Sequence, residues 1–287
     1  MTALVGVLEK DADKRRLIQD MIMNKNREVE QVGFVGFDGG SPALLMTGGE
    51  FCGNAARSAA WHFLDGKPGE ISIRVSGASK PIKAGFSDDL GAWAEMPLDG
   101  CSVRSAGDGM VWVDMEGISH LVLTADASAK YLKNCIGINK NENENEIDIV
   151  DKVYKVDEEQ LLRHAGKLLN SHPSSANACG VIFTGSALPC EANRNTKEHK
   201  LRIYPCVFVA TAGTTFYETA CGSGSAAVAI AEGVKSGRSL TLGLLQPSGM
   251  TIEATVEISR YPITLPTRAL ISGPIEVNCN TYHLDTV

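Results

Sequence analysis

The sequence predicts an α+β protein made of two domains of similar construction. The chain has 287 residues, more than one domain usually holds. A Cys-Gly turn followed by a helix-prone run of small residues occurs twice, at Cys52 and at Cys221. Short apolar segments separated by Gly, Asp and Ser surround both turns, which is the pattern of strands and turns. We therefore expect each half to place its helix among strands and to bury its own core.

The first half opens with a predicted strand and a predicted helix. Asp11 is placed to cap that helix, in which Leu17, Ile18 and further apolar side chains share one face. A second helix, from Ala55 to Leu64, is expected after the first Cys-Gly turn. The strands predicted in this half span residues 2–8, 32–37, 43–46, 71–75, 81–86, 92–96 and 110–115.

The second half follows a similar order. Helices are predicted around residues 127–135, over 157–168, and over 225–234 after the second Cys-Gly turn. The polar, low-complexity run 139–146 is expected to be a solvated loop that carries no chemistry. The strands predicted in this half span residues 118–123, 178–183, 199–204, 206–210, 240–244, 251–258 and 269–277.

The composition argues against several classes of function. A formal net charge of -7 without a Lys/Arg cluster disfavours nucleic acid or an anionic membrane as a partner. No apolar run approaches the roughly 20 residues of a membrane span, and no signal pattern opens the chain, so we expect a cytoplasmic protein. The eight cysteines are scattered, with no C-x-x-C motif and no zinc-ligand spacing, so no metal site is expected.

The two Cys-Gly turns predict a reactive thiol at the start of each helix. Unpaired N–H groups and the positive end of the helix dipole lower a thiol pKa from about 8.5 toward roughly 3.5–7.5. Racemising an amino acid requires one base on each side of Cα, and a thiolate facing a thiol supplies both protonation states without a cofactor. The backbone N–H groups of Gly53, Asn54, Gly222 and Ser223 can hold the α-carboxylate, where charge develops in the transition state.

Other interpretations of these turns remain open. A single turn of this kind is more often a buried cysteine before a helix, with glycine chosen for close packing, and only the duplication favours chemistry. The run 222–225 is glycine-rich and resembles a phosphate-binding loop, but it lacks the G-K-[ST] lysine and a G-x-G-x-x-G motif. A different class of function is a non-catalytic protein that binds a small anion, or a thiol redox protein that uses the same two cysteines.

The segments EFCGNAARSAA and ETACGSGSAAVAIA resemble the two active-site motifs of the diaminopimelate epimerase superfamily of cofactor-independent amino-acid racemases and epimerases. The resemblance implies two pseudo-symmetric domains, each an antiparallel barrel-like sheet around a central helix, with the active site between them. It implies domains over 1–116 and 117–265, with 266–287 returning to the first. It also implies Cys52 and Cys221 as the acid/base pair, a small amino acid as the ligand, and a homodimer.

The chain departs from diaminopimelate epimerases at two places. The Glu-Arg pair that those enzymes carry before the second cysteine is replaced by Ala212-Gly213, and their Gly-Asn-Pro-His segment reads Gly117-Ile118-Ser119-His120. A distal carboxylate would therefore lack its partners, and a buried charge without a partner is costly. The family also has an opening strand and a Gly-Asn or similar segment before the residues that match Met1-Thr2-Ala3, so the chain is expected to lack a short N-terminal piece that contributes a substrate contact.

The segments GGEFCGNA and EQVGF instead resemble histidine racemases that make D-histidine for staphylopine-type opine metallophores. The substrate favoured is therefore histidine, with diaminopimelate or another amino acid as the alternative. Glu30 or Glu50 is expected to hydrogen-bond the imidazole, although Glu30 also fits an exposed strand end and Glu50 a helix start. His120 is a further candidate contact, or a core histidine, and Asn177 lies near a substrate-binding asparagine of the family.

Overall fold

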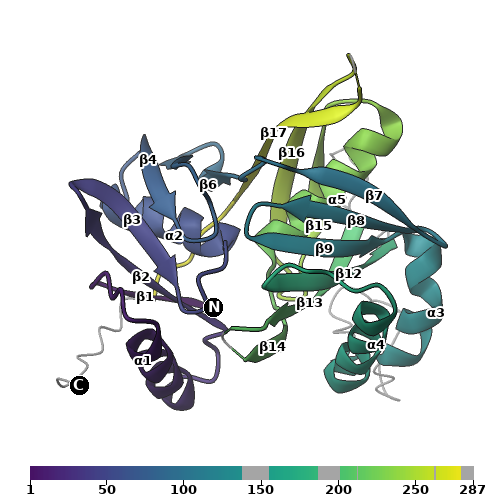
Figure 1. The fold of residues 1–287 in the computed structure, drawn as a ribbon, viewed down its shortest axis with the longest axis horizontal. Coiled ribbons are helices and arrows are strands. Elements are labelled where there is room, and N and C mark those ends of the chain that lie inside the picture. The colour runs from purple at the N-terminus through teal and green to yellow at the C-terminus, as the bar shows by residue number, and fades with distance from the viewer. Residues whose placement is uncertain (138–154, 187–200, 212, 262, 279–287) are drawn as a thin grey trace, which may run out of the picture.

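The computed structural model describes residues 1–137, 155–186, 201–211, 213–261 and 263–278 (Figure 1). These residues form five α-helices and a large mixed sheet, which confirms the α+β class. The helices are α1 (Ala12–Lys25), α2 (Gly53–Phe63), α3 (Ala125–Cys135), α4 (Glu158–Ser171) and α5 (Gly222–Ser236). The predicted run 139–146 lies outside the described residues.

The strands of the first part of the chain are β1 (Thr2–Val5), β2 (Gln31–Asp38), β3 (Ser41–Met46), β4 (Gly69–Val75), β5 (Ile82–Ser87), β6 (Gly91–Glu95), β7 (Ser102–Gly107), β8 (Met110–Met115) and β9 (Ile118–Leu123). Those that follow are β10 (Ile136–Gly137), β11 (Lys155–Val156), β12 (Ala178–Ser186), β13 (Leu201–Val209), β14 (Thr214–Tyr217), β15 (Leu240–Leu245), β16 (Thr251–Ser259) and β17 (Leu265–Gly273).

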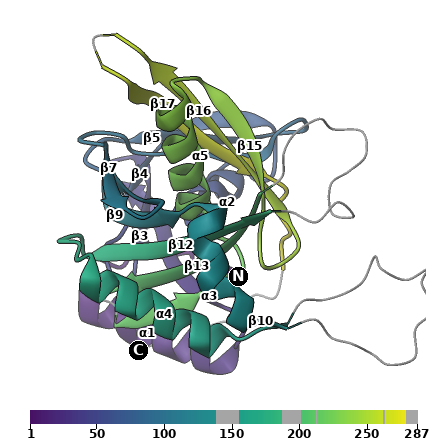
Figure 2. The same cartoon turned by 90° about the vertical axis from the view of Figure 1, so that its right-hand side faces the viewer.

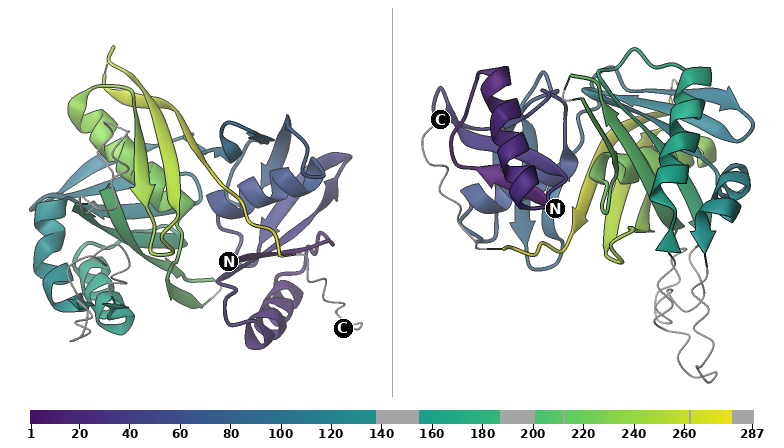
Figure 3. Two further views of the ribbon diagram at one scale, coloured as in Figure 1. Left: turned by 180° about the vertical axis from the view of Figure 1, so that it is seen from behind. Right: turned by 90° about the horizontal axis from the view of Figure 1, so that it is seen from below.

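The large sheet is continuous, and β17 joins its two parts. Its order is β1-β2-β3-β4-β5-β6-β17-β16-β15-β13-β12-β9-β8-β7, with β14 paired to β13. Within β17, Ile271 is paired with Ala254 of β16 on one side and with Ala94 of β6 on the other. The long yellow strand that crosses between the two parts in Figure 3 is this element.

The expectation of purely antiparallel sheets is wrong, because the large sheet is mixed. The pairs β1–β2, β3–β4, β9–β12 and β13–β15 are parallel. A parallel pair needs a crossover connection, and α1, α2, α3 with α4, and α5 lie in the connections between these strands. The helices that the sequence predicted are therefore also the crossovers, which strand patterns alone do not reveal.

Helices α2 and α5 each pack among their own strands. Helix α2 contacts β1 to β6, whereas α5 contacts β7, β8, β9, β12 and β15 to β17, so the contacts change between β6 and β7. Alanine lets strands approach closely: Ala55, Ala56, Ala59 and Ala60 of α2 are fully buried, and α5 is buried along most of its length. Because both helices are held this rigidly, the residues at their N-termini have fixed positions.

The other helices lie outside this core. Helices α3 and α4 cover β12 and β13 and contact each other (Figure 2). Their buried faces contribute Leu132, Leu161 and Leu168 to a second apolar cluster with Phe183 of β12. Helix α1 packs its apolar face on β2 (Figure 1). None of the described helices has the length and apolarity needed to cross a membrane.

Several strands differ from the prediction. The two strands expected over 199–204 and 206–210 are one, β13, which contains Pro205. The Pro205 carbonyl accepts a hydrogen bond from the N–H of Glu218, so the proline is paired on its acceptor side. Proline lacks the N–H that a sheet uses and so marks a strand end in sequence. Four further strands, β7, β10, β11 and β14, were not predicted, and β17 begins and ends earlier than expected.

Candidate active site

Each active-site helix begins directly after its cysteine, as the sequence predicts. Cys52 and Cys221 are the N-cap residues of α2 and α5, and both have extended backbone conformations. The Cys52 Sγ accepts a hydrogen bond from the Ala55 N–H at 3.4 Å, and the Cys221 Sγ accepts one from the Gly224 N–H at 3.3 Å. The helices start two to three residues earlier than predicted, because the sulfur itself caps them.

The N-termini of the two helices lie against each other. The Asn54 Nδ2 donates to the carbonyl oxygen of Ala220 at 2.8 Å, which links the first turn of α2 to the residue before Cys221. A Cβ placed on Gly53 would lie 3.7 Å from the carbonyl carbon of Gly222, and one on Gly222 would lie 3.2 Å from the Asn54 nitrogen. Glycine at both positions therefore permits the close approach.

A buried arginine holds Asn54 in place. The Arg57 Nη2 donates to the Asn54 Oδ1 at 3.2 Å, and its Nη1 donates to the carbonyl oxygens of Ala92 and Gly273, each at 3.2 Å. These carbonyls belong to β6 and β17, so the guanidinium ties α2 to the strand that joins the two parts of the sheet. The Asn54 side chain is thereby held by the Ala220 carbonyl through its Nδ2 and by Arg57 through its Oδ1.

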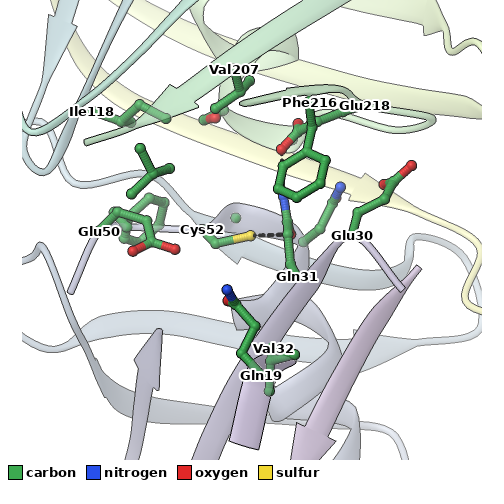
Figure 4. A pocket seen from close by; sticks show the side chains of 16 residues that line it. Gln19, Glu30, Gln31, Val32, Glu50, Cys52, Ile118, Val207, Phe216 and Glu218 are labelled. Carbon is green, nitrogen blue, oxygen red and sulfur yellow. Dashed lines mark hydrogen bonds between the residues drawn. The ribbon is translucent and has the colours of Figure 1, made fainter. Parts of the chain in front are cut away.

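A pocket opens beside these helix ends and encloses about 560 Å³, including solvent at its mouth (Figure 4). Seven of the ten predicted site residues line it, namely Cys52, Gly53, Asn54, Gly222, Ser223, Glu30 and Glu50. Cys221 is 1% exposed and lies next to the lining, with its Sγ 3.7 Å from the Ser223 Oγ. The other lining residues are Gln19, Gln31, Val32, Phe51, Ile118, Val207, Val209, Phe216 and Glu218.

Gln31 links Cys52 to the Glu218 carboxylate. The Cys52 thiol donates to the Gln31 Oε1 at 2.9 Å, and the Gln31 Nε2 donates to the Glu218 carboxylate (Figure 4). The negative charge of the same carboxylate also acts on the Cys221 thiol and raises its pKa. Two hydrogen bonds therefore link the Cys52 sulfur through Gln31 to Glu218, whose charge raises the pKa of both thiols.

The expected lowering of the thiol pKa values is wrong for this structure. Burial, followed by the negative charge of Glu218, raises the pKa of the Cys52 thiol to about 12, and the same two causes raise the pKa of Cys221 well above its usual value. The backbone N–H groups at the helix ends do lower both pKa values, but by less. Burial also raises the pKa of Glu218 to about 7, so this carboxyl titrates before either thiol.

His120 and Asn177 do not line the pocket. His120 is fully buried behind it, and burial lowers its pKa to about 3, so the imidazole is neutral. Its Nε2 lies 2.9 Å from the Ser223 Oγ, which in turn approaches Cys221. Asn177 is exposed and binds the Thr211 side chain and backbone, and Gly48 O. His120 therefore contacts Ser223 from outside the pocket, and Asn177 binds Gly48 and Thr211.

The two candidate glutamates differ in what they contact. Glu30 accepts from the Thr219 N–H at 3.0 Å through Oε1 and pairs with the N-terminal ammonium at 3.4 Å through Oε2. The Oε2 of Glu50 is buried with no hydrogen-bond partner, and burial raises the pKa of this carboxyl. The lining contains no Lys, Arg or His. The pocket is therefore acidic and suits a ligand with donor groups.

Gln31 and Glu218 line the pocket, and sequence analysis did not single out either residue. Both lie inside segments that carried the family resemblance, Gln31 in EQVGF and Glu218 three residues before Cys221. Their spacing in sequence gave no sign that they meet, because they are 187 residues apart.

Among the described residues no cluster of three or more His, Cys, Asp or Glu side chains could hold a metal ion.

Comparison with known proteins identifies the family. Residues 1–161 match the family described as "Histidine racemase CntK N-terminal domain". A histidine racemase from Fusobacterium nucleatum subsp. nucleatum is 27% identical over 283 residues, which cover 93% of this chain and 88% of that protein.

Two solved structures share the fold. A hydroxyproline epimerase from Agrobacterium vitis, with bound trans-4-hydroxy-L-proline, superimposes with a TM-score of 0.53 at 11% identity, over 93% of this chain and 78% of its own. A probable proline racemase from Agrobacterium radiobacter K84, with bound carbonate, gives a TM-score of 0.51 at 12% identity, over 95% and 83%. The chain therefore belongs to the histidine racemase family of isomerases, amino-acid racemases that work without pyridoxal phosphate.

Proposed function

We propose that this protein is a histidine racemase that inverts Cα with Cys52 and Cys221 as its two bases. The observation that carries the proposal is the contact between the N-termini of α2 and α5 at one pocket, with a cysteine as the N-cap of each. Both sulfurs then belong to one site, although 168 residues separate them in the chain, counting from 53 to 220.

The mechanism moves two protons. One cysteine, as the thiolate, takes the α-proton and becomes a thiol, while the other thiol gives its proton to the opposite face of Cα and becomes the thiolate. The backbone N–H groups of Gly53, Asn54, Gly222 and Ser223 hold the α-carboxylate, onto which negative charge moves as the α-proton leaves. Donors fixed before the reaction stabilise that charge more than they stabilise the bound substrate.

Glu50 is the better of the two candidates for holding the imidazole. Glu30 already binds a backbone N–H and the N-terminal ammonium, whereas the Glu50 Oε2 is buried without a partner in the pocket wall. An imidazole N–H can fill that vacant acceptor. Diaminopimelate is disfavoured, because its distal carboxylate would lie in a pocket that three glutamates and no basic side chain line.

We also propose a domain arrangement, an oligomeric state, a cellular location and a use for the product. The two cysteine-capped helices, each packed among its own strands, support two pseudo-symmetric domains that close over the substrate. The resemblance to racemases that supply opine metallophores supports a cytoplasmic homodimer whose D-histidine enters such a biosynthesis.

Solvent exchange at Cα tests the reaction. Incubation with L-histidine in deuterium oxide should give D-histidine that carries deuterium at Cα, because the incoming proton comes from a solvent-exchanged thiol. A panel of amino acids run in parallel identifies the substrate. Absence of exchange with every amino acid counts against the racemase, whereas turnover of LL-diaminopimelate and not of histidine counts only against the substrate.

Substitution of the cysteines separates catalysis from mere binding. Cys52→Ser and Cys221→Ser should each lose racemisation by on the order of 10²-fold or more, since a hydroxyl is a far weaker base than a thiolate. A protein that only binds an anion at the helix ends would keep its affinity in both variants and would show no exchange before substitution. Full turnover in both variants contradicts the two-base mechanism.

A further inference from the structure

The polar side chains that line the pocket differ in whether the protein itself satisfies them. A buried polar group normally has a hydrogen-bond partner, so one that lacks a partner calls for an explanation. The Glu50 Oε2 is buried and unpartnered, and within the described part of the chain the Gln19 amide makes no hydrogen bond. The polar lining side chains that do have protein partners are Glu30, Gln31, Cys52, Asn54, Glu218 and Ser223.

Gln19 occupies a position that an apolar side chain would normally hold. Helix α1 has two buried side chains, Arg15 and Gln19, which are four residues apart and therefore share one face. The Arg15 guanidinium donates to the carbonyl oxygens of Glu9, Lys10 and Thr47 at 3.1, 2.9 and 3.4 Å. Gln19 is 5% exposed, and its amide end points into the pocket (Figure 4). The burial of Arg15 is thus satisfied within the protein, whereas that of Gln19 is not.

Arg15 also fixes Gln19 relative to Glu50. Its bond to the Thr47 carbonyl ties α1 to the turn that leads into Glu50, and Gln19 follows one helical turn after Arg15. The unpartnered amide and the unpartnered carboxyl oxygen therefore lie on two segments that are held together. Polar groups that are fixed before binding lose less conformational freedom when a ligand arrives.

An imidazole ring has two nitrogens, and each needs a hydrogen-bond partner when the ring is buried. Glu50 supplies an acceptor for one of them. We propose that Gln19 binds the other, so that histidine is recognised at both ring nitrogens, by a carboxyl on one side and an amide on the other. An amide carries both a donor and an acceptor, so it suits a nitrogen with or without a hydrogen. The inference rests on the histidine racemase function proposed above and names a residue that selects the side chain; Gln19 takes no part in moving the α-proton.

Substitution of Gln19 tests the inference with two ligands. Gln19→Met keeps the length of the side chain and a good helix former but removes the amide. The kcat/KM for L-histidine should fall about tenfold, because one hydrogen bond to the ring is lost. L-β-(2-thienyl)alanine has a five-membered ring without nitrogen, so its inhibition constant should not rise. Asn24→Met removes an exposed amide from the same helix and is the matched control, which should change neither value.

The two ring-methylated histidines identify the nitrogen that Gln19 contacts. Each carries a methyl group on one nitrogen, and both should bind the unmodified enzyme more weakly than histidine does, because each leaves one polar group of the site unpartnered. In Gln19→Met one of the two should bind more tightly than it does to the unmodified enzyme, since its methyl then meets an apolar side chain. The other should stay weak, because Glu50 is unchanged. Unchanged inhibition constants for both would overturn the inference.

The stability of the free protein separates recognition from structural support. A buried amide without a partner destabilises the folded state, so Gln19→Met should melt at the same temperature as the unmodified protein or higher. A lower melting temperature together with equal losses for histidine and thienylalanine would overturn the inference, and so would an unchanged kcat/KM for histidine. Absence of exchange at Cα of histidine in the unmodified enzyme would instead remove the proposed function itself.

Discussion

At the sulfur of Cys52, two physical effects oppose each other. The helix N-terminus favours a thiolate, whereas burial and nearby carboxylates favour the thiol, and burial is the larger effect. The sequence showed the first effect, because a Cys-Gly turn before a helix can be recognised locally. It did not show the second, because the carboxylate responsible, Glu218, arrives from the other part of the chain. The thiolate therefore needs an internal base or the charge of the substrate.

Glu50 is predicted to determine recognition of the imidazole. In Glu50→Gln, the KM for histidine should rise about tenfold or more, since a hydrogen bond to a charged group contributes about 1.5–3 kcal/mol. Exchange at Cα of an amino acid without an imidazole should change little, and this second substrate is the internal control. Equal losses for both substrates would show that Glu50 supports the site instead of selecting the side chain.

Gly180 is predicted to be essential for the position of His120. A Cβ at this residue would lie 2.6 Å from the His120 Nδ1 and 3.0 Å from the carbonyl oxygen of Cys206, and the backbone cannot move away. Gly180→Ala should lower the unfolding free energy by about 1–3 kcal/mol and reduce kcat, because His120 contacts Ser223. Gly166→Ala in α4 is the control. A Cβ at this position would meet no neighbouring atom within 4 Å, so the substitution should not lower the unfolding free energy. Equal melting temperatures for the two variants would contradict this account.

At the scale of elements, the site depends on how closely α2 and α5 approach each other. Both helices and their starting cysteines were predictable, because small residues after a Cys-Gly turn form a local pattern. Most strands were predictable because short apolar segments between Gly, Asp and Ser are also a local pattern. The parallel pairing and the passage of β13 through Pro205 were not, since pairing partners lie far apart in the chain and proline usually ends a strand.

Ile271 of β17 sets the space available at both helix ends. A Cβ on Gly53 would lie 2.7 Å from its Cδ1, and one on Gly222 would lie 2.5 Å away. Gly53→Ala should therefore destabilise the protein by about 1–3 kcal/mol. Ile271→Val removes the Cδ1, so the same glycine substitution should cost less in that background, by a coupling of about 0.5–3 kcal/mol. Chemical denaturation of the four proteins measures this cycle, and additive costs would mean that the contact does not limit the approach.

At the scale of the whole molecule, β17 makes one sheet of strands that surround two helices, and the pocket lies where those helices meet. Cys52, Cys221 and the residues that follow them could be predicted because each group is contiguous in sequence. Gln31 and Glu218 could not, because they become neighbours only when β2 and the segment after β14 are brought together. Long-range contacts of this kind leave no periodic signal in a single sequence.

The buried Glu218 predicts how stability depends on pH. Its pKa is about 7 in the folded protein and 4.5 is its ordinary value, so the folded state binds more protons between these limits and loses stability as pH rises through them. One pKa unit corresponds to about 1.4 kcal/mol, so the loss amounts to about 3 kcal/mol. Glu218→Gln should gain that amount over the unmodified protein above neutrality and little below pH 4.5. His120, which has the opposite effect, cancels in the difference. A difference in unfolding free energy that is flat with pH would contradict burial of this carboxyl.

The most direct test of the two-base site is exchange at Cα of each enantiomer in the variants Cys52→Ala and Cys221→Ala. If the sulfurs lie on opposite faces of the substrate, neither variant should racemise histidine, and each should retain exchange with retention of configuration for a different enantiomer. Racemisation by either variant, or exchange of the same enantiomer by both, would contradict the account.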